Sequence, residues 1–309
     1  MDTIAKIRQL AKAKRKTIAL PEYDDQRTRE AAGIIEQEGI AKALLLTPET
    51  VRPQDKERYI EEYYRMHKAK GIELELVRTL FEDTLYCAAM MTREGAVDGF
   101  VAGAVHTTPD VGRAAIRCLG VDDRIGIACS CFIMVVPDCV YGDNGTFIFA
   151  DCGIIPDPSS RQLAAISVSA AELAAQVLGL VPRVALLSYS TRGSSKGKAV
   201  DKVTEALALA RKMAPDILID GELQVDAAIV PEVAEIKYPD SPLEGRANVL
   251  IFPDLEAGNI SYKLTQRLGR ARAIGPLLMG LKKPCSDLSR GCSTEDIVDC
   301  AAVTAIRAG

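Results

Sequence analysis

Short apolar runs alternate with longer amphipathic stretches over the first 120 residues of the chain. Runs such as KTIALPE have the length of a strand, whereas stretches such as DQRTREAAGIIEQEG carry apolar residues at helical spacing and end at a glycine. This alternation predicts a parallel sheet covered by helices, and therefore an α/β fold. The expected strands are 16–22, 42–47 and 98–105, and the expected helices are 25–39, 54–70, 73–93 and 108–120. The last of these helices is expected to have Thr108 as its N-cap.

Residues 125–153 break this alternation. Two apolar runs, 125–137 and 145–153, are joined by DCVYGDNG, whose GDNG has the turn residues of a hairpin. This pair is therefore expected to be antiparallel and to begin a second unit. The elements expected after it are a helix over 160–178, a strand over 183–190, a helix through Met213, strands over 216–224 and 246–254, a helix over 258–269, and a last helix after Ser293.

Composition and charge narrow the class of protein. The 309 residues carry a net charge of −4 without a long run of one sign, which argues against nucleic acid or a membrane surface as the main partner. Nine cysteines lie mostly in apolar stretches, with no CxxC pair and only two histidines, so no metal site is expected. Cysteines used in this way indicate a reducing compartment, and we expect a cytoplasmic protein.

Three segments with polar or cationic side chains join a predicted strand to a predicted helix. Open α/β sheets bind ligands outside the carboxyl ends of their strands, and helix N-termini favour anions, so the three segments are candidates for one shared cleft. Each also has an ordinary interpretation, as a structural histidine, a flexible Gly/Ser loop or a solvated lysine. The segments are AVHTTPDVGR (104–113), STRGSSKG (190–197) and PDLEAGNISYK (253–263), the last with Asn259 as helix cap and with Tyr262 and Lys263 in the first turn.

The segment DLSRGCSTEDI (287–297) gathers hydroxyls, a guanidinium, a thiol and carboxylates in eleven residues. Ser293 and Asp296 have the spacing of a capping box, which gives Asp296 a structural interpretation. A cap does not account for Ser289 and Arg290, which precede it. A serine and an arginine just before a helix start are suited to hold an oxyanion or a phosphoryl oxygen.

Six segments, in order, resemble the phosphate acetyltransferase (phosphotransacetylase) family. They are DGFVAGAVHTTPDVGR, FADCGIIPDPSSRQLA, LSYSTRGSSKG, APDILIDGELQVDAA, ANVLIFPDLEAGNISYKLTQRLG and DLSRGCSTEDI, which together extend from about residue 98 to 297. The resemblance implies two α/β/α domains of the isocitrate/isopropylmalate dehydrogenase type with a cleft between them. Residues 1–124 plus 277–309 would form the first domain and 125–276 the second. It also implies a homodimer.

The same resemblance implies an enzyme that transfers an acetyl group reversibly between acetyl phosphate and coenzyme A (CoA), with phosphate as the other product. Ser289, Arg290 and Asp296 match the family's catalytic positions, and Arg113 matches an arginine that holds substrate phosphates. Ser289 would orient the CoA sulfur, Arg290 would bind acetyl phosphate, and Asp296 would take the thiol proton. The expected substrate contacts are Arg113, Thr107, Thr108, Ser190, Thr191, Ser194, Asn259, Tyr262 and Lys263. No permanently bound cofactor is expected, since CoA enters as a substrate.

Two further positions bear on substrate binding and on the mechanism. The family usually has a CoA-linked arginine where this chain has His67, in RMHKAKG, which leaves a CoA contact there open. Cys292 lies inside the catalytic segment, but a thiol nucleophile has no histidine nearby in sequence, and the acceptor substrate already supplies a thiol. We therefore expect direct attack by the CoA thiolate, without an acetyl-enzyme.

Three alternatives remain at the level of sequence. A phosphate butyryltransferase would share the fold and chemistry, and one methylene changes discrimination by only about 1–3 kcal/mol. A catalytically silent, metabolite-sensing domain would keep the fold without turnover, although Ser289, Arg290 and Asp296 are all present. A hydride-transferring dehydrogenase is suggested by the fold alone, but no GxGxxG follows the first strand.

Overall fold

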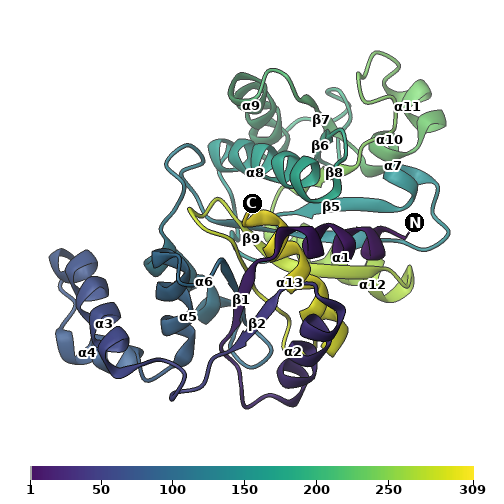
Figure 1. Ribbon diagram of the computed structural model, residues 1–309. Coiled ribbons are helices and arrows are strands. Elements are labelled where there is room, and N and C mark those ends of the chain that lie inside the picture. The colour runs from purple at the N-terminus through teal and green to yellow at the C-terminus, as the bar shows by residue number, and fades with distance from the viewer. Residues whose placement is uncertain (1) are drawn as a thin grey trace. The chain divides into compact units, whose positions relative to one another are not determined.

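The computed structural model describes residues 2–309, which form two compact units (Figure 1). The first unit contains residues 2–121 and Leu281–Gly309, and the second contains Asp122–Gly280. The sequence-based division at 124/125 and 276/277 differs from these boundaries by a few residues. Each unit combines a β-sheet with helices, so the predicted α/β class is confirmed.

The first unit has a parallel sheet in the order β2-β1-β3-β10. Its strands are β1 (Thr17–Leu20), β2 (Lys42–Leu45), β3 (Gly99–Val101) and β10 (Cys285–Ser286). Its helices are α1 (Thr3–Lys14), α2 (Gln26–Glu38), α3 (Pro53–His67), α4 (Leu74–Leu80), α5 (Thr84–Glu94), α6 (Thr108–Leu119) and α13 (Thr294–Arg307), with the 3₁₀ turn η1 (Lys68–Lys70). Because all four strands are parallel, the loops that follow them leave from the same edge of the sheet.

Helix α13 is the central helix of the first unit. Every residue from Ile297 to Ile306 is buried, because the helix packs on α1, α2 and the strands β1 and β3 (Figure 1). The carboxylate of Asp299 is fully buried within it and accepts a hydrogen bond from Arg8 of α1 at 2.8 Å. The N-terminal and C-terminal helices are therefore joined by an ion pair.

The second unit has a mixed sheet in the order β9-β4-β5-β8-β6-β7. Its strands are β4 (Cys129–Val135), β5 (Thr146–Ala150), β6 (Arg183–Leu187), β7 (Leu218–Leu223), β8 (Val249–Ile251) and β9 (Arg272–Met279). Its helices are α7 (Tyr141–Asn144), α8 (Ser160–Leu173), α9 (Lys198–Met213), α10 (Val225–Ile229), α11 (Pro231–Lys237) and α12 (Leu255–Leu268), with a π-helical turn, η2 (Ala174–Leu178), after α8. Strands β4 and β5 are antiparallel, with Val135 opposite Thr146, so the predicted hairpin is confirmed.

Two helix predictions in the first unit were wrong. The expected helix over 73–93 is two helices, since Asp83 caps α5 by accepting the Leu85 N–H at 2.8 Å and the chain turns between α4 and α5. The N-cap position of α6 is Thr107 rather than Thr108, which is the first helical residue. Local patterns specify helix boundaries weakly, because neighbouring polar residues compete for the cap position.

Among residues 2–309, no helix is both long enough and apolar enough to cross a membrane. The nine cysteines are free thiols, and all of them except Cys139 are buried.

Candidate active site

Three loops at the carboxyl edge of the first unit's sheet carry polar and charged side chains. They follow β1, β3 and β10, which are consecutive neighbours in the sheet. The loops contain residues 21–25, 102–107 and 287–293. The sheet therefore brings together segments that are about 80 and 180 residues apart in the chain.

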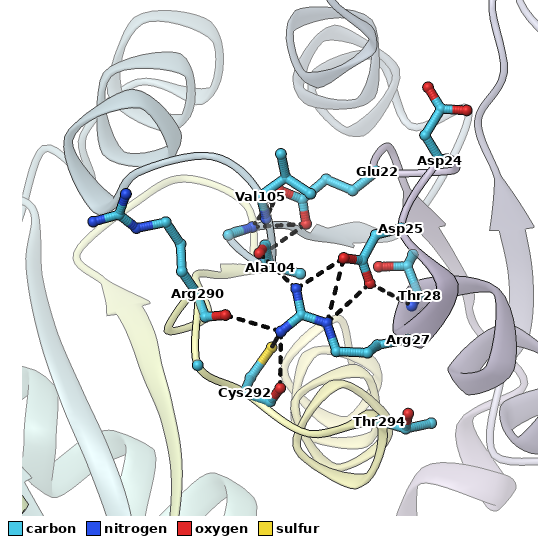
Figure 2. Close-up of polar contacts among 12 residues, drawn as sticks. Glu22, Asp24, Asp25, Arg27, Thr28, Ala104, Val105, Arg290, Cys292 and Thr294 are labelled. Atoms are coloured by element: carbon cyan, nitrogen blue, oxygen red, sulfur yellow. Dashed lines mark hydrogen bonds and ion pairs between the residues drawn. The ribbon is translucent and has the colours of Figure 1, made fainter.

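The loop after β10 presents Ser289 and Arg290 to solvent. The Ser289 hydroxyl accepts the Gly291 N–H at 3.3 Å, and the Ser289 carbonyl accepts the Cys292 N–H at 2.8 Å. The Arg290 guanidinium makes no hydrogen bond or ion pair within the described chain, and Figure 2 shows it pointing away from Arg27. Both side chains are therefore available to a small anionic ligand.

Asp296 lies in the first turn of α13, just after that loop. Its carboxylate accepts the Ser293 N–H at 2.8 Å, and its own N–H donates to the Ser293 hydroxyl at 3.2 Å. The predicted capping box is therefore confirmed. Asp296 is only half-buried, so the carboxylate borders solvent while the cap fixes its position.

Glu22, which follows β1, holds the loop after β3. Its buried carboxylate accepts the N–H groups of four consecutive residues at 2.8–3.0 Å, and these residues are Gly103, Ala104, Val105 and His106. Burial raises the pKa of Glu22, but the hydrogen bonds from His106 and the backbone outweigh it, and the net shift is downward. The turn that could cradle an external anion is thus occupied by the protein's own carboxylate.

His106 lies between two carboxylates. Its Nδ1 is 2.8 Å from Glu22 Oε1, and its Nε2 is 2.9 Å from Asp83 Oδ2. Hydrogen bonds to Asp83 and then Glu22 raise the pKa of His106 to about 10. The imidazole is therefore a cation at neutral pH and is no general base, so the structural interpretation of this histidine holds.

Arg27 joins the three loops (Figure 2). Its guanidinium donates to Asp25, to the Ala104 carbonyl at 2.8 Å, and to the Arg290 and Cys292 carbonyls at 2.9 Å each. Arg27 belongs to α2, Ala104 follows β3, and the other two carbonyls follow β10. One side chain thus contacts the backbone on both sides of Gly291.

Asp287 is a buried acid at the start of the same loop. Both carboxylate oxygens are buried without a hydrogen bond of good geometry, although the Thr108 side chain and the Leu288 N–H are close enough to favour the charged form. Burial raises the pKa of Asp287 to about 7. Gly103 packs against it, since a Cβ at Gly103 would lie 2.3 Å from Asp287 Oδ1, and its φ of +115° also requires glycine.

The remaining predicted contacts of the first unit lie at the start of α6. The Thr107 hydroxyl donates to Asp110 at 2.6 Å, and Arg113 pairs with the same carboxylate at 2.9 Å. Arg113 is exposed, and Thr108 is half-buried beside Asp287. The three side chains therefore occupy the helix start nearest the loop after β3.

In the second unit, Glu222 closes the loop after β6. Its carboxylate accepts the Ser190 hydroxyl at 2.8 Å and the Gly193 N–H at 2.7 Å. Burial raises the pKa of Glu222, but the Gly193 and Ser190 hydrogen bonds outweigh it and the net shift is downward. The Thr191 hydroxyl accepts the Gln224 N–H, so Ser190 and Thr191 are engaged within the unit. Ser194 is exposed, although its hydroxyl accepts the Thr191 N–H at 3.0 Å.

Helix α12 begins at Leu255, three residues earlier than predicted. Asp254, rather than Asn259, is the N-cap, and it accepts the Ala257 N–H at 2.8 Å. Gly258 was misleading as a boundary: it is a helical residue without a side chain because a Cβ there would lie 2.2 Å from the Asp151 carbonyl. Tyr262 and Lys263 therefore lie beyond the first turn, contrary to the prediction.

The predicted contacts on α12 have different environments. The Asn259 amide donates to the Cys152 carbonyl at 3.1 Å. The Tyr262 ring is buried and stacks on Phe132 with ring centroids 4.0 Å apart. Lys263 is exposed, with its ammonium 4.9 Å from the Tyr262 ring centroid. Asn259 and Lys263 remain open to a ligand more readily than Tyr262.

Sequence reasoning missed Glu22, Arg27, Asp83 and Asp287. A signal existed for Glu22, since a charged residue directly after a buried strand lies at the edge where ligands bind. The partners of Arg27 and His106 are remote in sequence, so no local pattern indicates them. Among residues 2–309, no group of three or more His, Cys, Asp or Glu side chains could hold a metal ion.

Comparison with known proteins shows that the chain is a transferase. The family model described as "Phosphate acetyl/butaryl transferase" matches residues 2–305. The chain is 47% identical to the phosphate acetyltransferase of Thermoanaerobacterium thermosaccharolyticum and 46% identical to that of Acetivibrio thermocellus, covering 100% of this chain and 100% and 98% of the relatives. It therefore belongs to the phosphate acetyl/butaryl transferase family.

A solved structure agrees with this assignment. The phosphotransacetylase from Streptococcus pyogenes superposes with a TM-score of 0.91 at 37% identity, covering 99% of this chain and 98% of that one. The predicted family and the enzyme class are confirmed.

Proposed function

We propose that this chain transfers an acetyl group reversibly between acetyl phosphate and CoA by direct attack of the CoA thiolate. The observation that carries this proposal is the arrangement of the loop after β10. An exposed hydroxyl and an unpaired guanidinium, from Ser289 and Arg290, lie just before the capped carboxylate of Asp296. Family membership supplies the reaction.

Asp296 takes the proton from the CoA thiol, since the thiolate is the nucleophile. The sulfur then forms a bond to the acetyl carbonyl carbon, and the bond between that carbon and the phosphate oxygen breaks. Phosphate leaves with the electron pair. Ser289 orients the sulfur by a hydrogen bond, and Arg290 stabilises the negative charge of the tetrahedral intermediate and of the departing phosphate.

Two features support a mechanism without an acetyl-enzyme. Burial raises the pKa of the Cys292 thiol to about 11, so this thiol is protonated at neutral pH. His106 is a paired cation and cannot activate it. We propose that the substrates are held further by Arg113, Thr107 and Thr108, and by the second unit's Ser190, Thr191, Ser194, Asn259, Tyr262 and Lys263.

Substitution of the proposed catalytic residues tests this mechanism. Arg290→Ala and Asp296→Asn should each lower kcat on the order of 10²–10³-fold, the usual cost of losing one group that stabilises the transition state. The assay follows acetyl-CoA thioester formation from acetyl phosphate and CoA. Glu295→Gln is the matched control, since Glu295 shares the first turn of α13 but pairs with Arg8. Wild-type kcat in either catalytic variant would contradict the assignment.

The acyl group is the main alternative. A butyryl-transferring enzyme would use the same three residues with a larger apolar pocket. Acetyl phosphate and butyryl phosphate assayed side by side, with kcat/KM compared, decide between them.

We also propose a cytoplasmic homodimer. The free thiols support a reducing compartment. For the dimer, α12 presents three exposed apolar side chains on one face at helical spacing, namely Ile260 (57% exposed), Leu264 (53%) and Leu268 (81%). A second copy of the chain would cover this stripe, which is costly to leave in water.

A further inference from the structure

Arg27 uses all its donors inside the protein. A guanidinium has five N–H groups. Nε and one Nη2 hydrogen face the Asp25 carboxylate, the second Nη2 hydrogen faces the Ala104 carbonyl, and the two Nη1 hydrogens face the Arg290 and Cys292 carbonyls. No donor is left for a substrate phosphate. This separates Arg27 from Arg290, whose guanidinium is unpaired within the described chain.

The two Nη1 hydrogen bonds hold the otherwise least constrained part of the loop after β10 (residues 287–293), which is the proposed catalytic loop. They lie on either side of Gly291, which has the widest conformational freedom in the loop. Hydrogen bonds from within the loop reach only the Gly291 and Cys292 N–H groups. Arg27 is thus the contact that orients the Arg290 and Cys292 carbonyls, and with them the direction in which the Arg290 side chain leaves the backbone.

The loop after β3, which Arg27 contacts at Ala104, is also held in place. The Ala104 carbonyl accepts from Arg27, while the Ala104 N–H donates to Glu22 at 2.8 Å. Glu22 and Arg27 both belong to the segment after β1, and they bind the N–H and the carbonyl of the same residue. The segment after β1 therefore holds the loop after β3 in place at that residue. Arg27 lies in the first turn of α2, where a cation opposes the helix dipole, and Asp25 beside it compensates.

We infer that Arg27 is a positioning residue: it sets the geometry of Ser289 and Arg290 relative to Asp296 and does not touch the substrates. This inference rests on the proposed function for its catalytic meaning. A misplacement of about 1 Å at a reacting centre can cost on the order of 10²-fold in rate. Lysine cannot replace Arg27, because one ammonium with three donors does not reach acceptors from three loops.

The first experiment is kinetic. Arg27→Gln and Arg27→Lys should lower kcat about 10–100-fold, with KM for CoA and for acetyl phosphate within about threefold of wild type. The matched control is Arg29→Gln, since Arg29 lies on the same helix and donates to the Tyr23 and Asp24 carbonyls but to no residue of the catalytic loop. A tenfold rise in KM for CoA at unchanged kcat would overturn the inference and make Arg27 a substrate-binding residue.

The second experiment does not depend on turnover. The exposed Arg290–Gly291 bond is a trypsin site, and trypsin cuts where a loop opens locally. In folded Arg27→Gln protein, cleavage after Arg290 should be at least about tenfold faster than in wild type or in Arg29→Gln, as followed by mass spectrometry. Equal cleavage rates would overturn the inference. If wild type forms no acetyl-CoA, the proposed function fails, and the cleavage rates alone then decide the role of Arg27.

Discussion

His106 shows how a single side chain can look catalytic and yet be structural. It follows a strand, as catalytic bases often do, but each ring nitrogen faces a carboxylate, Glu22 on one side and Asp83 on the other. Both carboxylates have a lowered pKa after burial is outweighed by these hydrogen bonds. The triad is therefore a fixed ionic clamp at the edge of the first sheet.

The clamp predicts how stability depends on pH. The pKa of His106 is raised from 6.5 to about 10, so its contribution is complete below pH 6.5 and is lost as the pH rises through about 10. Near neutral pH, His106→Gln should lower the free energy of unfolding by about 2 kcal/mol, as expected for hydrogen bonds to charged groups. The difference from wild type in urea unfolding should shrink towards pH 10. A difference that stays constant from pH 6.5 to 10 would contradict the clamp.

Asp287 should behave in the opposite sense to a stabilising carboxylate. Burial raises its pKa from 3.8 to about 7, with Glu22 adding to the rise and His106 opposing it. The contribution of Asp287 to the stability of the protein is therefore fully present below pH 3.8, and it is lost as the pH rises through about 7. At pH 8, the Asp287→Asn variant should therefore be more stable than wild type, with a free energy of unfolding higher by on the order of 1 kcal/mol. A loss of stability at pH 8 in thermal unfolding would show that the ionised carboxylate has a partner.

At the scale of elements, the sequence predicts what is encoded within one segment. The hairpin of β4 and β5, the long helix α8 and the capping box of Ser293 and Asp296 are all confirmed, because their signals lie within a few residues. Predictions of helix boundaries were wrong where the identity of a residue is explained by a contact with a distant part of the chain. Gly258 is small because the Asp151 backbone lies against it, and local sequence contains no sign of that contact.

The candidate site divides in the same way. Ser289, Arg290 and Asp296 lie within eight residues and can be found as a motif. Glu22 and Arg27 act on backbone groups about 80 and 260 residues away, so only the assembled sheet reveals them. In sequence, the segment that contains Ser190 and Thr191 looks like an open anion-binding loop. In the structure, the Glu222 carboxylate already occupies part of that loop. That these residues bind the substrates stays a prediction.

At the scale of the whole molecule, the proposed dimer makes a prediction about α12. Leu264→Glu combined with Leu268→Glu should shift the protein from dimer to monomer in analytical ultracentrifugation, with the far-UV circular dichroism unchanged. Charged side chains on a buried apolar face are costly, whereas on a solvated face they are not. Val181→Glu is the control, since Val181 is equally apolar and exposed but lies outside the stripe. A dimer that survives the double substitution would exclude α12 as the interface.

The first unit is built from two stretches of chain separated by the whole second unit. Strand β10 and helix α13, which complete the first sheet and carry Ser289, Arg290 and Asp296, leave the ribosome only after residues 122–280 have been made. At about 5–20 residues per second, the early strands wait at least several seconds for their last neighbour. During synthesis, β3 therefore has an unfilled edge and the nascent chain lacks the three proposed catalytic residues; both change together when residues 281–309 have been made.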